Sequence, residues 1–307
     1  MGIATTRKPH TLTPTINPAG LQTLIQLADQ AGHAIMEIYQ RSSPLQQQIK
    51  SDSSPLTEAD LAANAILVVG LCAHWPHIPV LSEENLNQFA PGEQPPLYWA
   101  VDPLDGTKEF IKRNGEFTVN LALVVDGVPQ IGLVGVPAQG LLYVGCAGSA
   151  WHAAPMSRKR SAAGWEDISV SGYAPGTNGD VDAARPLRVA MSRSHPSAEL
   201  AAWLAPWGLI ETRDVGSSLK FCLVAEGAVD VYPRLGPTCI WDTAAGHALV
   251  AAAGGRVCQL DGAPLRYTSP AQTLNPFFVA WGQQPQSRLM DRSARGPCPA
   301  ETPTHHG

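Results

Sequence analysis

Two aspartates three positions apart, Asp102 and Asp105, follow an apolar run in this chain of 307 residues. Residues 97–101 predict a buried strand, and Pro103 is expected to end it because proline has no backbone N–H for the ladder. The strand would deliver both carboxylates into one turn, and such hard oxygen ligands suit Mg²⁺. The Gly106-Thr107 step would expose backbone N–H groups to an anion if a short helix begins there. A metal pair beside an anion cradle is the outline of a phosphatase site.

More carboxylates stand at the ends of predicted elements. Asp60 lies early in a helix, Glu83 follows a strand, and Asp242 precedes a helix that ends near residue 253. Taken singly, each is better explained as a solvated or capping side chain than as a ligand, since Asp is favoured at helix starts and in turns. The case for a metal site therefore depends on the fold bringing these groups together.

The elements that must position them are read from periodicity. Apolar residues at helical spacing predict a helix over 21–39, and an Ala-rich helix follows up to about residue 73. Asp126-Gly127 predicts a hairpin turn between two β runs. The strands expected are residues 78–81, 118–125, 131–136, 141–144, 187–191, 228–232, 255–259 and 277–280. Helices expected between the later strands, at 198–204, 218–225 and 243–253, indicate an α/β second half.

Composition excludes several classes of protein. A formal net charge of −5 argues against a nucleic-acid duplex as partner. No apolar stretch is long enough to predict a membrane span. The six cysteines are scattered, which fits a reducing cytoplasm. The basic run 158–160 has fewer cations than lipid-binding clusters usually carry, so a solvated loop is favoured over peripheral contact with the inner face of the membrane.

Three strings of residues together resemble a known family. Residues 102–107, with Glu83-Glu84 upstream and Trp241-Asp242 downstream, resemble the inositol monophosphatase superfamily of Mg²⁺-dependent, lithium-sensitive phosphatases. The longer string 102–120, with 216–222 and 232–234, is similar to the bacterial 3′(2′),5′-bisphosphate nucleotidases within it. The resemblance covers roughly residues 18–282, and extended strings are more specific than one short motif.

The resemblance implies an α/β fold, the layered αβαβα sandwich of the inositol monophosphatase type. An N-terminal α+β half, residues 17–156, would meet a C-terminal α/β half, residues 186–283, at the metals. Residues 157–185 are rich in Gly, Ser, Asp and Ala and predict a mobile insertion or connection. Residues 1–16 are expected to form a flexible tail and residues 284–307 a disordered one.

Metal ligands are carried over residue by residue. Glu83, Asp102 and the backbone carbonyl of Leu104 would hold one Mg²⁺. Asp102, Asp105 and Asp242 would hold a second, with Asp102 shared. Two ions so placed clamp the attacking and leaving oxygens of an in-line displacement.

The resemblance also implies the catalytic groups. A metal-activated water is the expected nucleophile, because these motifs assemble no Ser, Cys or His triad. Its activator is either Glu83 or a hydrogen-bonded pair of Asp60 and Thr107, with a third, weaker Mg²⁺ as an option. The choice between them stays open at this point.

Substrate contacts are expected from both halves. Each has an alternative: Lys220 fits a solvated helix residue, His195 a plain turn and His247 a helix surface. Trp99 and Trp241 beside the acidic motifs are expected to pack in the core. The expected substrate-binding residues are Leu104, Asp105, Gly106, Thr107, Ser192, Arg193, His195, Ser217, Ser218, Lys220, Arg234 and Asp242.

The activity implied is removal of the 3′-phosphate from adenosine 3′,5′-bisphosphate, a by-product of sulfate assimilation, giving AMP and phosphate. An inositol or sugar monophosphatase on the same metal site is the alternative enzyme. Lys108-Glu109-Phe110 favours the nucleotidase, because inositol-preferring relatives resemble Asp-Gly-Thr-Thr-Asn-Phe there. A non-catalytic nucleotide-binding regulator is disfavoured, since all the acidic positions are filled. Oligomeric state and lithium sensitivity stay open.

Overall fold

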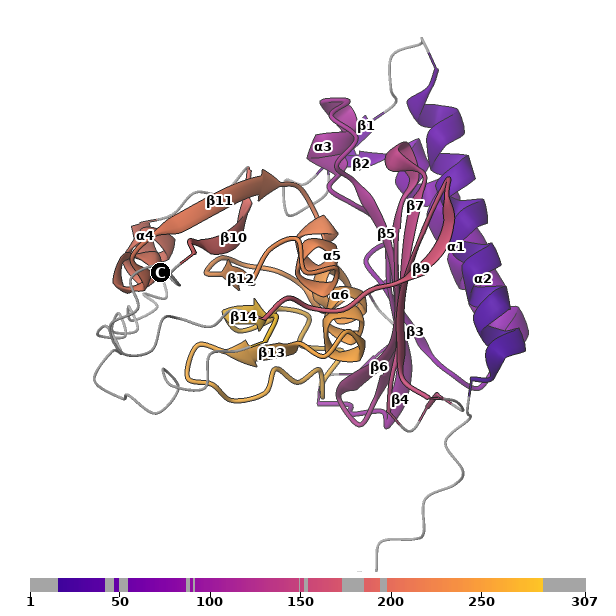
Figure 1. Cartoon of the computed structure of the whole chain (residues 1–307). Coiled ribbons are helices and arrows are strands. Elements are labelled where there is room, and N and C mark those ends of the chain that lie inside the picture. Colours follow the sequence, from indigo (N-terminus) through magenta and orange to yellow (C-terminus); the bar gives the residue numbers. More distant parts are fainter. Residues whose placement is uncertain are drawn as a thin grey trace, which may run out of the picture.

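Helices and sheets alternate in five layers (Figure 1). The computed structural model describes residues 16–41, 47–49, 55–86, 89–90, 92–148, 150–151, 154–172, 185–193 and 198–283. The α-helices of this part of the chain are α1 (Pro18–Tyr39), α2 (Glu58–His74), α3 (Thr107–Ile111), α4 (Ala198–Leu204), α5 (Leu219–Ala225) and α6 (Ile240–Ala252). Helices α1 and α2 cover one face of a large sheet, α5 and α6 fill the space to a smaller sheet, and α4 lies outside it. The predicted αβαβα sandwich is confirmed.

The large sheet has seven strands, of which only the first pair is parallel. Its order is β3 (Val80–Ser82), β4 (Leu97–Asp105), β5 (Thr118–Val125), β6 (Val128–Val136), β7 (Leu141–Cys146), β8 (Met156–Ser161) and β9 (Gly164–Asp167). Every residue of β5 is buried, because α1 and α2 cover one face of the sheet and α6 the other. The β5–β6 turn has positive φ at Asp126 (48°) and Gly127 (72°), as the predicted hairpin requires.

The small sheet has five strands and mixed directions. Strand β10 runs parallel to both β11 and β12, whereas β14 is antiparallel to its neighbours β12 and β13. Its order is β11 (Ile210–Val215), β10 (Leu187–Ser192), β12 (Val231–Arg234), β14 (Phe278–Trp281) and β13 (Arg256–Gln259). A separate two-stranded sheet pairs β1 (Gln47–Ile49) with β2 (Pro55–Thr57).

Helix α6 lies close against the large sheet because two strand positions lack a side chain. A Cβ built on Gly132 of β6 would lie 2.2 Å from the carbonyl oxygen of Ala245. A Cβ on Gly145 of β7 would lie 2.5 Å from the Cα of Leu249. The glycines therefore set how near α6 approaches the sheet, and with it the position of the acidic start of the helix.

The structure differs from several predictions made from the sequence. Strand β4 does not end at Pro103 but continues to Asp105, with a shift of register after Asp102. Residues 157–167 are not a mobile insertion: they belong to strands β8 and β9, while 173–184 lie outside the described residues. Ile16, predicted to belong to the flexible tail, is buried and donates its N–H to the Ala150 carbonyl, while residues 1–15 and 284–307 lie outside the described residues. Strands β1, β2 and β11 were not expected.

The basic run on β8 is not a solvated loop. Arg158 pairs with Asp167 at 2.9 Å and Lys159 with Glu226 at 2.8 Å. Arg160 pairs with Asp29. These cations are thus held by carboxylates of β9, of the residue that follows α5, and of α1, and peripheral membrane contact gains no support from them. No helix among the described residues is long and apolar enough to cross a membrane.

Candidate active site

The two aspartates of β4 are presented by an irregularity in that strand. Pairing with β5 shifts between Asp102 and Asp105, and the Asp102 carboxylate accepts the Leu104 N–H at 3.1 Å. Gly106 follows with φ 88°, a left-handed conformation that favours glycine, and α3 begins at Thr107 as expected. The Leu104 side chain is buried in the core, which leaves its carbonyl as the group able to serve a ligand.

Asp242 reaches the same place from the start of α6. Its carboxylate accepts the Cys239 N–H at 2.7 Å, in a capping box in which Asp242 is the third helical residue. The capping alternative is thus real, but it does not exclude a second role. One carboxylate oxygen fixes the helix start, and the side chain still faces the aspartates of β4.

Asp102, Asp105 and Asp242 form the acidic cluster of this site. One oxygen from each lies within 4.8 Å of the others. Burial raises the pKa of Asp102, and the charges of Glu83, Asp105 and Asp242 raise it further. Burial and the charge of Asp105 raise the pKa of Asp242 to about 8. Oxygen donors that repel one another in a buried site fit a divalent cation, whose charge would offset the repulsion.

Glu83 stands next to this cluster, as expected for a residue that follows β3. Its carboxyl group shares a hydrogen bond with that of Asp102. The backbone N–H of Glu83 donates to Val101 at 3.2 Å, which holds the end of β3 beside β4. Four of the five predicted metal positions are therefore side chains in one neighbourhood, and the fifth is the Leu104 carbonyl.

Asp105 receives more support than the sequence indicated. Its carboxylate accepts the Ser218 N–H at 2.7 Å, lies 2.9 Å from the Ser218 hydroxyl, and accepts Asn120 at 3.4 Å. Burial raises the pKa of Asp105, while the Lys220 charge and these hydrogen bonds lower it. Asn120 was not predicted as a site residue, although it belongs to the string 102–120. It pairs with Asp102 across β4 and β5.

Asp60 and Thr107 are brought together from segments 47 residues apart. The Thr107 hydroxyl donates to Asp60 at 3.2 Å and lies 3.4 Å from the Leu104 carbonyl. The other oxygen of Asp60 accepts the N–H and the hydroxyl of Thr57 at 2.7 and 2.6 Å. The predicted pair is thus one hydrogen-bonded unit, and its role in activating water stays a prediction.

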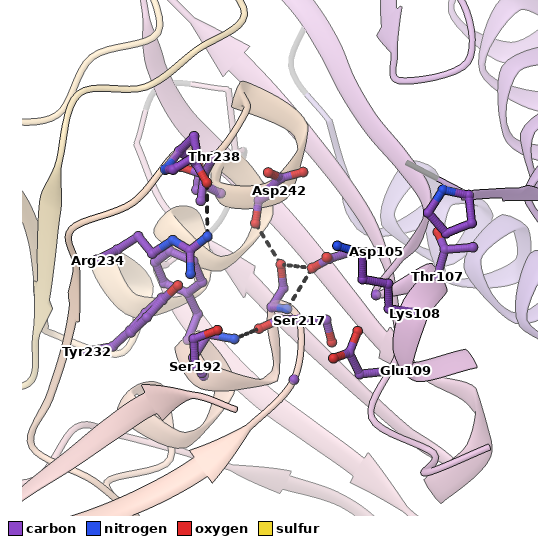
Figure 2. A pocket seen from close by; sticks show the side chains of 18 residues that line it. Asp105, Thr107, Lys108, Glu109, Ser192, Ser217, Tyr232, Arg234, Thr238 and Asp242 are labelled. Carbon is purple, nitrogen blue, oxygen red and sulfur yellow. Dashed lines mark hydrogen bonds between the residues drawn. The ribbon is translucent and has the colours of Figure 1, made fainter. Parts of the chain in front are cut away.

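The acidic cluster opens into a pocket of about 260 Å³ between the two halves (Figure 2). Lys108, Glu109, Tyr232 and Thr238 line it without having been predicted, although the first three stand in strings that carried the resemblance. The predicted residues that line it are Asp105, Gly106, Thr107, Ser192, Ser217, Ser218, Lys220, Arg234 and Asp242.

Two cations lie on the C-terminal side of the pocket. Lys220 is only 4% exposed, so it is not a solvated helix residue. Its ammonium group donates to the carbonyls of Ser217 and Val215 at 2.7 and 3.2 Å, and burial lowers its pKa to about 8. Arg234 donates to the Pro237 carbonyl at 2.9 Å, while its buried Nε has no hydrogen-bond partner within the described residues.

Two other residues lie elsewhere than predicted, and a third is not described. Arg193 does not line the pocket: its guanidinium group holds Glu116 at 2.7 and 3.1 Å. His195 lies outside the described residues. His247 is buried rather than on the helix surface, and Trp99 and Trp241 pack in the core as expected.

This fold and this acidic pocket define a class, the metal-dependent phosphatases built as a layered αβαβα sandwich. The sequence model of the Inositol monophosphatase family matches residues 19–287, and the chain belongs to that family.

Several named proteins are similar to the chain over most of its length. The chain is 47% identical over 258 residues to the 3′(2′),5′-bisphosphate nucleotidase CysQ of Escherichia coli O6:H1, covering 84% of this chain and 98% of the relative. It is 43% identical over 262 residues to the CysQ of Buchnera aphidicola, covering 85% and 92%. The crystal structure of CysQ from Bacteroides thetaiotaomicron superposes with a TM-score of 0.69 at 39% identity, covering 87% of this chain and 98% of that one.

Proposed function

We propose that this chain is a Mg²⁺-dependent 3′(2′),5′-bisphosphate nucleotidase. It would hydrolyse adenosine 3′,5′-bisphosphate to AMP and phosphate. The oxygen of water would bond to phosphorus as the bond between phosphorus and the 3′-oxygen breaks. The relatives that bear this name support the proposal. The observation that carries it is one pocket lined both by carboxylates for cations and by two cations, the buried Lys220 and Arg234. Figure 2 labels Arg234 together with Asp105 and Asp242. A substrate with two phosphates matches both sides of such a pocket.

We propose two metal positions, which the set of oxygen donors supports. Glu83, Asp102 and the Leu104 carbonyl would hold one Mg²⁺, and Asp102, Asp105 and Asp242 the other. When bound, the ions would offset the charge of the 3′-phosphate and lower the pKa of the attacking water. Carboxylates that are already gathered and buried need no rearrangement to do so.

We propose the Asp60–Thr107 pair as the group that takes the proton. Because the Thr107 hydroxyl donates to Asp60, its oxygen is left to accept a hydrogen bond from water. Asp60 is held by Thr57 and can receive the proton through Thr107. The Glu83 carboxyl group is hydrogen-bonded to that of Asp102, which favours a role for Glu83 as a metal ligand rather than as the base.

Lys220 and Arg234 would receive the 5′-phosphate. Arg suits forked contacts to phosphate oxygens, and the buried Nε of Arg234 is a donor in need of an acceptor. The N–H groups of Gly106 and Thr107 would hold the 3′-phosphate beside the cluster.

The described cysteines are free, which supports the proposed cytoplasmic location.

A phosphate-release assay with three substrates tests the proposal. Adenosine 3′,5′-bisphosphate should give the highest kcat/KM, adenosine 3′-monophosphate a lower one because it lacks the second phosphate, and inositol monophosphate the lowest. A higher kcat/KM for inositol monophosphate would overturn the substrate assignment in favour of the alternative phosphatase. Release from none of them by the Mg²⁺-loaded protein would overturn the enzyme itself.

A further inference from the structure

Glu116, which precedes β5, joins the N-terminal half to a turn of the C-terminal half. Its carboxylate accepts the Gly216 N–H at 2.9 Å, and its backbone carbonyl accepts the Ser217 hydroxyl at 2.7 Å. We propose that Glu116 is a positioning residue: it holds the turn 216–218 so that the Ser218 N–H points at Asp105, and it thereby sets the affinity of the site for divalent cations. The inference rests on the metal site of the proposed function.

The turn has a backbone that must be held in place. Ser217 has φ 41°, a left-handed conformation that is unfavourable for a residue with a side chain. Gly216 before it is packed tightly: a Cβ there would lie 2.8 Å from the Glu109 Cγ and 2.8 Å from the Glu116 carbonyl oxygen. Glu116 accepts one hydrogen bond from each of these two residues, and the two bonds therefore oppose relaxation of the strained turn.

The next residue is the one that reaches the acidic cluster. The Ser218 hydroxyl lies 2.9 Å from Asp105 and 2.6 Å from the Asp242 carbonyl, but it has one hydrogen and can donate to only one of them. The backbone N–H has no such choice and donates to Asp105 at 2.7 Å. A shift of the turn would therefore weaken the shortest hydrogen bond that this carboxylate accepts, and change how Asp105 faces a cation.

Arg193 braces the Glu116 carboxylate from the C-terminal half. It contacts both carboxylate oxygens, at 2.7 and 3.1 Å, and donates to the Asp214 carbonyl at 2.7 Å. Its side chain is 51% exposed, whereas that of Glu116 is 16% exposed, so water and salt screen this ion pair. We expect the bonds to Gly216 and Ser217 to matter more than the ion pair.

The chain offers a matched control in Glu226. Its side chain is also 16% exposed, and it also joins the two halves, through Lys159 at 2.8 Å and the Tyr143 hydroxyl at 3.0 Å. It does not line the pocket. Glu226→Ala thus removes a comparable link between the halves without touching the turn 216–218.

The test is calorimetric titration of the metal-free full-length chain with Mg²⁺, for the wild type, Glu116→Ala and Glu226→Ala. Glu116→Ala should raise the Kd for Mg²⁺ about tenfold, as expected for a lost hydrogen bond to a charged group. Glu226→Ala should stay within about twofold of the wild type, whatever its effect on Tm. At saturating Mg²⁺, Glu116→Ala should recover most of the kcat of the wild type.

A Kd for Glu116→Ala within about twofold of the wild type would overturn the inference, as would an equal rise in Glu226→Ala. Should Glu116→Ala not fold, Glu116→Asp replaces it: the shorter side chain withdraws the carboxylate from Gly216, and an unchanged Kd contradicts the proposal in the same way. The titration uses no nucleotide. A wild type that binds Mg²⁺ without cleaving the bisphosphate would refute the proposed function alone.

Discussion

Asp105 meets two opposed demands. Its burial raises the pKa of the carboxyl group, while Lys220, Ser218 and Asn120 favour the charged form that a cation needs. Donors fixed by the fold do this without reorganisation when ligands arrive. The surroundings of Asp105 are therefore part of the active site as much as the carboxylate itself.

Asp105→Asn should lower kcat by a factor of about 100 or more, since an amide replaces a charged ligand. The fold should persist, because an amide of the same shape still accepts from Ser218. Phosphate release at saturating Mg²⁺ measures the loss, and circular dichroism checks the fold.

The control for that variant is Asp167→Asn on β9, where the side chain is 88% exposed and far from the pocket. It should leave kcat unchanged. Near-normal turnover by Asp105→Asn with enough Mg²⁺ would remove Asp105 from the metal site.

Helix α6 is the element whose seating decides where Asp242 lies. Gly132 faces the backbone of α6 at a distance that leaves no room for a methyl group. Gly132→Ala should therefore lower the free energy of unfolding by about 1–3 kcal/mol, the usual cost of overpacking. It should also weaken Mg²⁺ binding, because a displaced α6 carries Asp242 with it.

Gly135→Ala on the same strand is the matched comparison. A Cβ there would meet its neighbours at 3.7 Å or more, an ordinary contact. This variant should keep the Tm and the Mg²⁺ affinity of the wild type. Equal losses in both variants would show that β6 tolerates no side chain at either position, and that the seating of α6 is not the cause.

Acid should destabilise the protein through His247, a buried residue of α6. Burial and, to a smaller extent, the charge of Arg266 together lower its pKa to about 3, and its ring nitrogen lies 3.2 Å from the Tyr267 hydroxyl. A histidine with a lowered pKa in the folded state stabilises above the unfolded pKa, near 6.5, and loses that contribution as the pH falls. The loss should be about 1.4 kcal/mol per pH unit below 6.5.

Urea unfolding at pH 7 and pH 5 checks this expectation. His247→Gln should lose less stability between the two pH values than the wild type does. His33→Gln, which replaces an exposed histidine of α1, should behave as the wild type. A wild type and a His247→Gln variant with the same pH dependence would contradict the role of His247.

The proposed metal site joins elements of both halves of the molecule. Asp102 and Asp105 come from β4 of the large sheet, whereas Asp242 starts α6 in the layer between the sheets. A cation bound only by the folded chain stabilises it by mass action, about 2.7 kcal/mol at a concentration 100 times the Kd. Removing the metal also restores the repulsion among buried carboxylates.

Chelator should therefore lower the Tm by about 5–10 °C relative to protein in saturating Mg²⁺. It should also abolish phosphate release, and added Mg²⁺ should restore both. Differential scanning calorimetry and the phosphate assay measure the two effects. Full activity in excess chelator, or an unchanged Tm, would refute a metal site at the acidic cluster.

Local patterns predicted much of this fold. Helix α4 begins and ends where its periodicity indicated, and the Asp126-Gly127 turn adopts the positive φ values that its residues favour. Asp102 and Asp105 were found because they adjoin one strand. Helix periodicity, turn chemistry and neighbouring ligands all depend on residues a few positions apart, which one stretch of sequence contains.

Packing decided the rest. The sequence alone predicts a loop for the basic run at 158–160, because its partners Asp29 and Glu226 are distant in sequence. Paired with them, these residues form strand β8 between β7 and β9. Arg193 contacts Glu116, 77 residues away in the sequence, and the buried Lys220 donates to the carbonyl of Val215 at the end of β11. Which side chains face one another depends on how the two sheets stack around α5 and α6, and no local pattern encodes that geometry.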